Sequence, residues 1–263
     1  MSNRMKSLWS KNDFGIGLWC TLDDPKVQEL AAGAGFDYLT IDLQHGFNSW
    51  GTLCNSMRAL HTADATIFAR VPANREDYIT RVLDAGADGV VVPFVESKED
   101  AERAVAACRY PTNSDSVIGG TRSYGPLWAD YDGSLDTDAV NENVLCVVQI
   151  ETVKGVKNAE AIASVPGVSA LYVGPYDLAL SLGMGGLTYR DSPVIHEAFE
   201  TVIGIARKHG LAAGMHCNGP EMAAYWQKRG ASMLTSALDS TTIAGAFSAL
   251  AADVRSATAI EGN

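Results

Sequence analysis

Residues 84–91 read DAGADGVV, a phrase that describes the end of a helix, a turn at a glycine and the start of a buried strand. Similar phrases occur twice more, as AGAGFDYL at 32–39 and as KRGASML at 228–234. A glycine that closes a helix and is followed at once by an apolar strand marks the boundary of an αβ unit. Three such boundaries predict a fold in which helices and strands alternate.

Eight short apolar runs have the pattern of strands that are buried on both faces. We expect strands at 15–18, 38–43, 66–71, 89–94, 144–150, 170–173, 211–215 and 231–236. Helical patterns lie between them, at 25–34, 50–62, 75–85, 98–109, 155–164, 194–209, 220–229 and 241–257. Eight strands alternating with eight helices predict a single (β/α)8 TIM barrel over residues 1–263. No GxGxxG phrase follows the first strand, which disfavours a Rossmann fold.

Two segments depart from this regular alternation. Residues 110–143 separate the fourth helix from the fifth strand, and we expect this long connection to be a functional loop or lid without secondary structure. The last helix is rich in alanine and has an apolar face. We expect a homo-oligomer in which a neighbour buries this face; ordinary packing on the same barrel is the alternative.

Composition and charge exclude several classes of protein. Hydrophobic residues make up 47% of the chain and charged residues 19%, which fits a folded protein with a large core. The net charge of −11 disfavours a nucleic-acid partner, because the phosphates of nucleic acids are also negatively charged. No apolar run approaches the roughly 20 residues of a membrane span. The first residues have no apolar h-region and the five cysteines show no CxxC spacing, so we expect no secretory signal, and free thiols in the cytoplasm.

The chemistry is expected at the carboxyl ends of the strands, where TIM barrels carry their active sites. Polar side chains gather at these ends after five of the predicted strands. They are Asp42, Gln44 and His45; Arg70; Gln149 and Glu151; Asp177, close to Gly174 and Pro175; and His216 with Asn218.

Glu151 and Asp177 follow consecutive strands, so they are expected to converge. Two carboxylates in close proximity repel each other unless a cation or a proton lies between them, and oxygen ligands suit a hard ion such as Mg²⁺ or Mn²⁺. The alternative is that each caps the helix after it, since Asp177 precedes the helical LALSL and Glu151 lies near Lys154. The spacing leaves both interpretations open.

Arg70 and His45 are candidate catalytic residues. Arg70 ends the apolar run TIFARV without a helical partner four residues on, so we favour a role in holding a carboxylate or keto oxygen over a structural ion pair. His45 lies just past a strand, and an imidazole with a near-neutral pKa is a natural general base. Capping of the next helix is its alternative role.

The positions of the lysines bear on whether the site could form a covalent intermediate with a carbonyl substrate. A Schiff-base enzyme needs a lysine at a strand end inside the barrel. Lys154 comes closest, but it lies three residues past the strand end. A metal ion is then the remaining way to stabilise an enolate.

Five phrases resemble the class II, metal-dependent 4-hydroxy-2-oxoheptanedioate (pyruvate) aldolases of the pyruvate/phosphoenolpyruvate barrel superfamily. They are AGAGFDYLTIDLQHG (32–46), ARVPANR (69–75), LDAGADGVVVPFVES (83–97), VVQIETVKGVKNAEAIASVPGVSALYVGPYDLALSLG (147–183) and RGASML (229–234). The resemblance implies a TIM-barrel lyase that reversibly cleaves 4-hydroxy-2-oxo acids to an aldehyde and pyruvate or hydroxypyruvate through a metal-stabilised enolate. It also implies a divalent ion (Mg²⁺, Mn²⁺ or Co²⁺) and a homohexamer in which the last helix packs on a neighbour.

Carried over residue by residue, the resemblance implies that Glu151 and Asp177 bind the metal. It implies that Arg70 contacts the keto or enolate oxygen and that His45 is an acid/base acting through a water. Gln149 would also contact the pyruvyl oxygen.

Further roles follow from the same resemblance. Gly174, Pro175 and the amide of Asp177 would cradle the carboxylate and methyl group of pyruvate. Asp42 and Asp84 match acidic positions that orient or assist the histidine. Because Asp84 lies at a helix end, it would serve a site only across a subunit boundary; a surface carboxylate is the alternative.

The chain departs from the family pattern at three places. Many relatives read IDxEH where Gln44 stands here. The phrase GTRSYGP (119–125) resembles a subgroup with RSFGP that accepts hydroxypyruvate-like donors, so Arg122 and Tyr124 would shape the aldehyde pocket unless they serve loop packing. His216 stands where relatives carry an apolar residue, as a substrate contact or as a hydrogen-bonded wall residue.

Three rival functions stay open. One is an acyl-CoA lyase of the same superfamily, although this acidic chain shows no basic cluster for the phosphates of CoA. Another decarboxylates oxaloacetate and traps the enolate. The third is a barrel that binds metabolites without catalysis.

Overall fold

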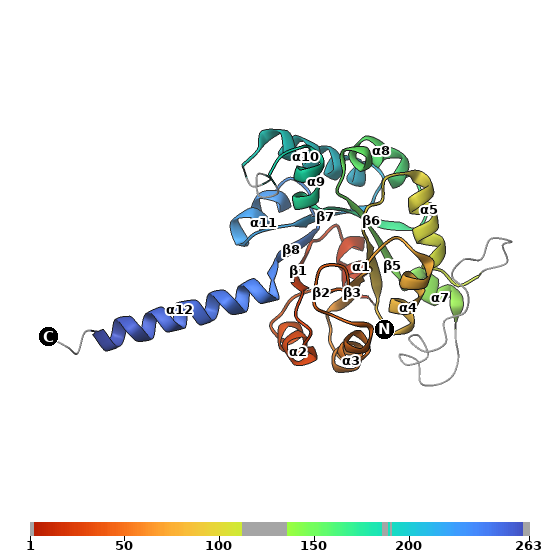
Figure 1. The fold of residues 1–263 in the computed structure, drawn as a ribbon. Coiled ribbons are helices and arrows are strands. Elements are labelled where there is room, and N and C mark those ends of the chain that lie inside the picture. Colours follow the sequence, from red (N-terminus) through yellow and green to blue (C-terminus); the bar gives the residue numbers. More distant parts are fainter. Residues whose placement is uncertain (1–2, 112–135, 186–188, 190, 260–263) are drawn as a thin grey trace.

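The computed structural model describes residues 3–111, 136–185, 189 and 191–259, and eight parallel strands close into one barrel in chain order (Figure 1). The TIM barrel predicted from the sequence is confirmed, and the strand ends shift by one or two residues. The strands are β1 (Gly15–Cys20), β2 (Tyr38–Asp42), β3 (Thr66–Arg70), β4 (Gly89–Val92), β5 (Leu145–Ile150), β6 (Val168–Val173), β7 (Ala212–His216) and β8 (Met233–Leu238).

In the described residues, eight helices follow the strands as predicted, and three short helices are additional. The eight are α2 (Pro25–Gly33), α3 (Trp50–Leu60), α4 (Glu76–Asp84), α5 (Lys98–Ala107), α8 (Val153–Ala163), α10 (Pro193–Lys208), α11 (Pro220–Gln227) and α12 (Asp239–Ala259). The additional ones are α1 (Arg4–Ser10), α7 (Thr137–Asn143) and α9 (Pro175–Ser181). Helix α7 corrects the expectation that all of 110–143 lacks secondary structure; its Asp136 cap satisfies the free N–H groups of the first turn.

The repeated αβ phrase contains a polar residue directly before its strand, and this residue fastens the strand to its neighbour. Asp37 accepts a hydrogen bond at 2.9 Å from the backbone of β1, and Asp88 accepts one at 2.7 Å from β3. Ser232 accepts a longer one at 3.3 Å from β7. The phrase therefore ends a helix at its glycine and also fixes the start of a strand pair.

The barrel interior is a packed core. Helix α1 closes its amino-terminal end with Met5, which is fully buried. Above it lie aromatic rings such as Tyr38, whose ring would be 2.3 Å from a Cβ at position 17, so only glycine fits there. The inner cluster consists of Met5, Trp19, Tyr38, Phe68, Val91, Leu145, Val147, Ala170, Tyr172, Ala212 and Met233. A filled interior leaves the carboxyl end of the barrel as the place for a site.

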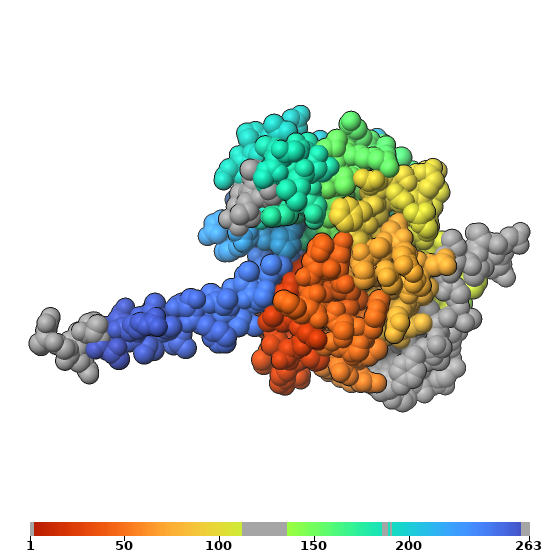
Figure 2. Space-filling model, viewed as in Figure 1, coloured from red at the N-terminus to blue at the C-terminus, as the bar shows by residue number. Residues whose placement is uncertain are grey.

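Helix α12 does not pack on its own barrel. It leaves the body of the molecule after β8 and stands clear of it in the ribbon and the space-filling views (Figures 1 and 2). Between 241 and 258, only Ile243 is not exposed. Packing on the same barrel, the alternative left open by the sequence, is therefore wrong for this helix. No helix in the described part of the chain is long and apolar enough to cross a membrane.

Candidate active site

The side-chain alternation of the strands brings the candidate residues to the carboxyl end of the barrel. Successive residues of a strand point to opposite faces, so Tyr38 and Asp42 of β2 face the same way. The strand register places Asp42 directly beside Arg70, and Gln149 beside Tyr172. Both Asp42 and Arg70 are buried.

Asp42 and Arg70 form a two-pronged ion pair at this end of the barrel. Arg70 donates from Nε to Oδ1 at 2.9 Å and from Nη2 to Oδ2 at 2.6 Å, and Trp19 donates from Nε1 to Oδ2 at 3.1 Å. Burial acts to raise the pKa of Asp42, but the bonds and charge of Arg70 outweigh it and hold the pKa below its usual value. A guanidinium has five N–H donors, so three remain for another acceptor.

Glu151 is a buried carboxylate held by strained backbone. It is 2% exposed, and its Oε1 accepts from the backbone N–H of Phe94 at 2.8 Å. Phe94 has a φ of +52°, a left-handed conformation that costs a non-glycine residue about 1 kcal/mol or more. Burial raises the pKa of Glu151 to about 7, with a further contribution from the charge of Asp177.

Gly174 lets Glu151 approach the start of α9, whose first turn contains Asp177. A Cβ at position 174 would lie 2.5 Å from Oε2 of Glu151 and 3.2 Å from Nε2 of Gln149, so no larger residue fits. Pro175 is buried as the first residue of α9. The structure thus brings together Glu151, Gln149, Gly174 and Asp177.

The helix-capping interpretation fails for both acids. The cap of α8 is Thr152, whose hydroxyl accepts from the N–H of Gly155 at 3.0 Å. Helix α9 has no side-chain cap. Lys154 does not neutralise Glu151, because its ammonium group pairs with Glu96 at 3.2 Å on the outside of the barrel. This position also gives no support to a Schiff-base role for Lys154.

A divalent cation fits these residues. The structure shows a buried carboxylate with one backbone donor, a second carboxylate whose charge acts on it, and a glycine that keeps the space before Oε2 free of a side chain. Two protein ligands would leave open coordination positions for substrate and water. In the described residues, no cluster of three or more His, Cys, Asp or Glu side chains has metal-site geometry.

Gln149 points to a ligand as well. It is 3% exposed, and its Oε1 is buried without a hydrogen-bond partner in the described structure. Buried amide oxygens are normally hydrogen-bonded, so this unpaired acceptor beside Gly174 is available to an N–H or O–H donor of a ligand or of a water molecule.

His216 forms part of the wall. Its Nδ1 lies 3.5 Å from the hydroxyl of Tyr172, which in turn bonds Thr235 at 2.7 Å, and its ring meets the edge of Trp19 at 5.8 Å. Burial and then the positive charge of Arg70 lower the pKa of His216 to about 4, so the ring is neutral at pH 7. These contacts favour the hydrogen-bonded wall residue among the two expected roles.

Three predicted residues are not brought into this cluster. His45 is exposed in the loop after β2, where its backbone N–H donates to Oδ1 of Asp42 at 3.2 Å. Asp84 ends α4 and so lies at the opposite end of the barrel from the site of its own chain. Arg122, with Tyr124, lies outside the described residues.

Sequence reasoning missed Trp19 and Phe94. Trp19 lies on an inward position of β1, donates to Asp42 and has the guanidinium of Arg70 at 4.9 Å from its ring. Counting alternate positions along GIGLWC from Gly15 would have placed this side chain inside. The left-handed backbone of Phe94 has no such signal, because non-glycine residues rarely adopt it.

A closed parallel barrel with buried charged residues at the carboxyl ends of its strands has the architecture of a TIM-barrel enzyme, with the candidate site where such enzymes carry theirs. The family model described as HpcH/HpaI aldolase/citrate lyase matches residues 15–246. The chain belongs to this family, and the expected lyase activity of the aldolase type is confirmed at the level of the family.

Similar proteins agree with this assignment. The chain is 36% identical over 217 residues, 81% of each protein, to 5-keto-4-deoxy-D-glucarate aldolase of Klebsiella pneumoniae. A family protein from Burkholderia cenocepacia has a similar structure, with a TM-score of 0.88, 30% identity and coverage of 97% of this chain and 100% of that one. The structure of the citrate synthase SbnG superposes with a TM-score of 0.85 at 28% identity, covering 98% and 99% of the two chains.

Proposed function

We propose that this chain is a class II aldolase that cleaves 4-hydroxy-2-oxo acids, with Glu151 and Asp177 as ligands of a divalent metal ion such as Mg²⁺, Mn²⁺ or Co²⁺. The observation that carries the proposal is the buried carboxylate of Glu151, which forms no ion pair within the described residues and lies beside Asp177 on the same end of the barrel as Arg70. When bound, the ion would supply Lewis-acid stabilisation of negative charge on the keto oxygen.

The protein's own groups would bind and orient the keto acid. Arg70, fixed by Asp42, offers its remaining N–H donors to the keto oxygen as negative charge develops there. The Nε2–H group of Gln149 would donate to the same oxygen, and its unpaired Oε1 would accept from an O–H group of the substrate or of a water molecule. Gly174 and Pro175, with the backbone N–H of Asp177, would face the carboxylate and methyl group of pyruvate. His216 would line the wall.

His45 would move the proton of the aldol hydroxyl group. Its loop lies at the carboxyl end of β2, and the residue is exposed there. Removal of that proton breaks the bond between C3 and C4 and releases an aldehyde, while the electron pair stays with the keto acid as the enolate. Protonation of the enolate at C3 then gives pyruvate. Asp84 of a neighbouring copy would assist only across a subunit boundary.

The substrate class rests on the similar proteins. The relative from Klebsiella pneumoniae is named for a keto-deoxy sugar acid, 5-keto-4-deoxy-D-glucarate. We propose that this enzyme takes substrates of the same kind, with pyruvate or hydroxypyruvate as the keto acid. The likeness to a citrate synthase favours carbon–carbon bond formation with a second keto acid as the alternative activity.

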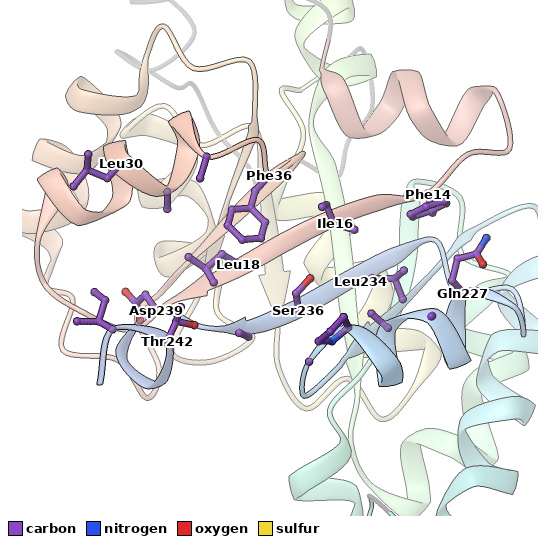
Figure 3. Close-up of a pocket in the computed structure, with 18 of the residues that line it drawn as sticks. Phe14, Ile16, Leu18, Leu30, Phe36, Gln227, Leu234, Ser236, Asp239 and Thr242 are labelled. Carbon is purple, nitrogen blue, oxygen red and sulfur yellow. The ribbon is translucent and has the colours of Figure 1, made fainter. Parts of the chain in front are cut away.

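We also propose that the active form is a homo-oligomer, up to a hexamer, in which α12 packs on a second copy. An apolar groove of about 800 Å³ runs over β1 and β8 between α2 and α11, where a TIM barrel places the helix that follows its eighth strand. Figure 3 shows Ile16 and Leu18 of β1 beside Leu234 of β8 along this groove. Leu30, on its rim, is 65% exposed.

The helix and the groove are complementary. The large apolar side chains of α12 that are exposed, Phe247, Leu250 and Val254, have the spacing of one helix face. In the described structure, no helix covers the groove, and the apolar face of α12 packs against no other part of the chain. Exchange of this helix between two copies would bury both.

The free state of all five cysteines further supports a reducing, cytoplasmic compartment.

An assay of aldol cleavage tests the proposal. The enzyme is stripped with EDTA, reloaded with Mg²⁺, Mn²⁺ or Co²⁺, and assayed for formation of the keto acid from 5-keto-4-deoxy-D-glucarate and related acids. Activity should return with metal in the wild type and stay absent in Asp177→Asn. Full activity of the EDTA-treated enzyme would contradict the metal site. Decarboxylation of oxaloacetate without aldol cleavage would favour the enolate-trapping alternative, and metal and pyruvate binding without turnover would favour a binding barrel.

A further inference from the structure

Asp239 is a buried carboxylate at the junction between β8 and α12, 2% exposed and outside the site described above. It lies at the end of the groove next to Thr242 in Figure 3. No cation pairs with it in the described structure; its partners are neutral N–H and O–H groups. Burial of a charge is costly unless hydrogen bonds compensate it, so the bonds that Asp239 accepts are needed to keep it there.

Three of its four hydrogen bonds come from the loop after β1. Oδ1 of Asp239 accepts from the backbone N–H of Thr21 at 2.8 Å and from its hydroxyl at 2.7 Å. Oδ2 accepts from the backbone N–H of Leu22 at 3.1 Å. The N–H of Ser240 adds a fourth bond, to Oδ1 at 2.7 Å. One carboxylate therefore fixes the course of the chain directly after Cys20.

The same loop holds the segment that carries His45. The carbonyl oxygen of Thr21 accepts from the backbone N–H of Phe47 at 2.8 Å. The carbonyl of Cys20 accepts from the side chain of Asn48 at 3.0 Å. Gly46 lies so close that a Cβ there would be 3.1 Å from the carbonyl oxygen of Thr21. The three residues after His45 thus rest on two residues of the loop after β1.

The other side of the His45 loop is fixed by the site itself. Oδ1 of Asp42 accepts from the backbone N–H groups of Gln44 at 3.0 Å and His45 at 3.2 Å. Asp42 is already fixed by Arg70. Beyond Asp42, the His45 loop is anchored by Phe47 on the carbonyl of Thr21 and by Asn48 on the carbonyls of Cys20 and Asp42. The anchor at Thr21 is the one that Asp239 holds in place.

We propose that Asp239 is a positioning residue for the aldolase reaction, acting through Thr21 on the loop that carries His45. The inference rests on the proposed role of His45 as the acid/base. A shift of about 1 Å in a catalytic group costs up to about 100-fold in rate. Asp239→Asn replaces one acceptor oxygen by an NH2 group, which cannot accept from the N–H donor that it faces. The loop should therefore shift, while Arg70 and Glu151 keep their contacts.

The test is a double-mutant cycle of Asp239→Asn and His45→Ala, assayed by steady-state aldol cleavage. We expect Asp239→Asn to lower kcat about 10-fold or more, with KM for the keto acid substrate within about twofold. In the His45→Ala background the same change should lower kcat no further. Asp37→Asn is the matched control, because Asp37 accepts from the opposite end of β1; it should reduce thermal stability and leave kcat unchanged.

The outcomes separate the inference from the proposed function. If His45→Ala is impaired and Asp239→Asn lowers kcat by the same factor in both backgrounds, the positioning role is overturned while the role of His45 stands. An equal loss of kcat in Asp37→Asn would also overturn it. A fully active His45→Ala variant contradicts the proposed acid/base and the inference with it. Should Asp239→Asn fail to fold, Thr21→Val, which removes only the hydroxyl donor, carries the same cycle with a smaller loss.

Discussion

At the scale of single residues, the guanidinium group of Arg70 binds the carboxylate of Asp42 and still has N–H donors left for the oxygen of a substrate. Its Nε and Nη2 are engaged by Asp42, and its guanidinium lies 4.9 Å from the ring centre of Trp19. A planar guanidinium can donate two parallel hydrogen bonds to a carboxylate while it lies beside an aromatic ring, and the ammonium group of a lysine cannot. The orientation of the remaining donors is therefore set before a substrate arrives.

Arg70→Lys should lower kcat/KM for aldol cleavage by on the order of 10²-fold, because an ammonium group cannot bind Asp42 with two prongs and also reach the keto oxygen. Steady-state kinetics measure this loss, and a circular-dichroism melt checks that the fold survives. Arg75→Lys is the control, since Arg75 makes a similar two-pronged pair with Asp77 on the surface. A kcat/KM within twofold of the wild type in Arg70→Lys would contradict the assignment.

Glu151 should make the metal-free protein less stable as the pH rises. Its pKa is raised to about 7 in the folded chain, above the ordinary value of 4.5, so folding favours the protonated form. The contribution of protonated Glu151 to the free energy of unfolding is fully present below about pH 4.5 and is lost as the pH rises through 7. Thermal melts of the EDTA-treated protein should show this loss in the wild type, and Glu151→Gln should remove it. The same pH dependence in both proteins would contradict the environment described for Glu151.

The positions of candidate residues could be predicted from the sequence where those residues lie at strand ends. Asp42, Arg70, Gln149 and Glu151 lie at or directly after the ends of β2, β3 and β5, so the rule that sites lie at those ends found them. What the rule cannot supply is the conformation between strands. The exposed ring of His45 is an example, since its loop depends on contacts with a different strand.

At the scale of elements, alternation of buried runs and amphipathic stretches located all eight strands and the eight longer helices. Such elements have a period that persists over several turns or residues. Helix α1 has only seven residues, and its signal is a single buried residue, Met5, with an Asn3 cap. A helix this short gains its stability from the barrel that it closes, so it could not be predicted from local sequence.

Met5→Ala should destabilise the protein by about 2–5 kcal/mol, because Met5 is fully buried at the closed end of the barrel and a cavity would remain. Urea denaturation measures the free energy of unfolding. Ser10→Ala, at the exposed end of the same helix, should change it by less than about 0.5 kcal/mol. Equal effects of the two substitutions would show that α1 does not plug the barrel.

At the scale of the whole molecule, the eight strands form a closed ring of hydrogen-bonded neighbours. In the described structure, however, no helix covers the apolar groove over β1 and β8. The sequence indicated an apolar face on the last helix, yet it could not place that helix, because the same face fits the chain's own barrel or that of a neighbour. The course of the chain after Asp239 decides this, and it leads α12 away from the groove (Figure 1).

Phe247→Glu should dissociate the oligomer, since it puts a charge on the apolar face of α12 that the groove of a second copy would bury. Sedimentation velocity over a range of concentrations measures the state of assembly. Ala252→Glu is the control: this exposed position lies on the opposite side of the helix. Dissociation by both variants, or by neither, would contradict exchange of the helix.

Exchange of the pyruvate methyl protons for deuterium tests the central claim, a metal-assisted enolate at Glu151, most directly, because it requires no aldehyde. NMR in D₂O would follow the methyl signal of pyruvate with the EDTA-treated wild type, with added Mn²⁺ or Mg²⁺, and with Glu151→Gln. Glu96→Gln is the control, a carboxylate that binds Thr152 outside the barrel. We expect exchange only with metal, in the wild type and in Glu96→Gln. Exchange that persists without metal, or in Glu151→Gln at the wild-type rate, would contradict the account.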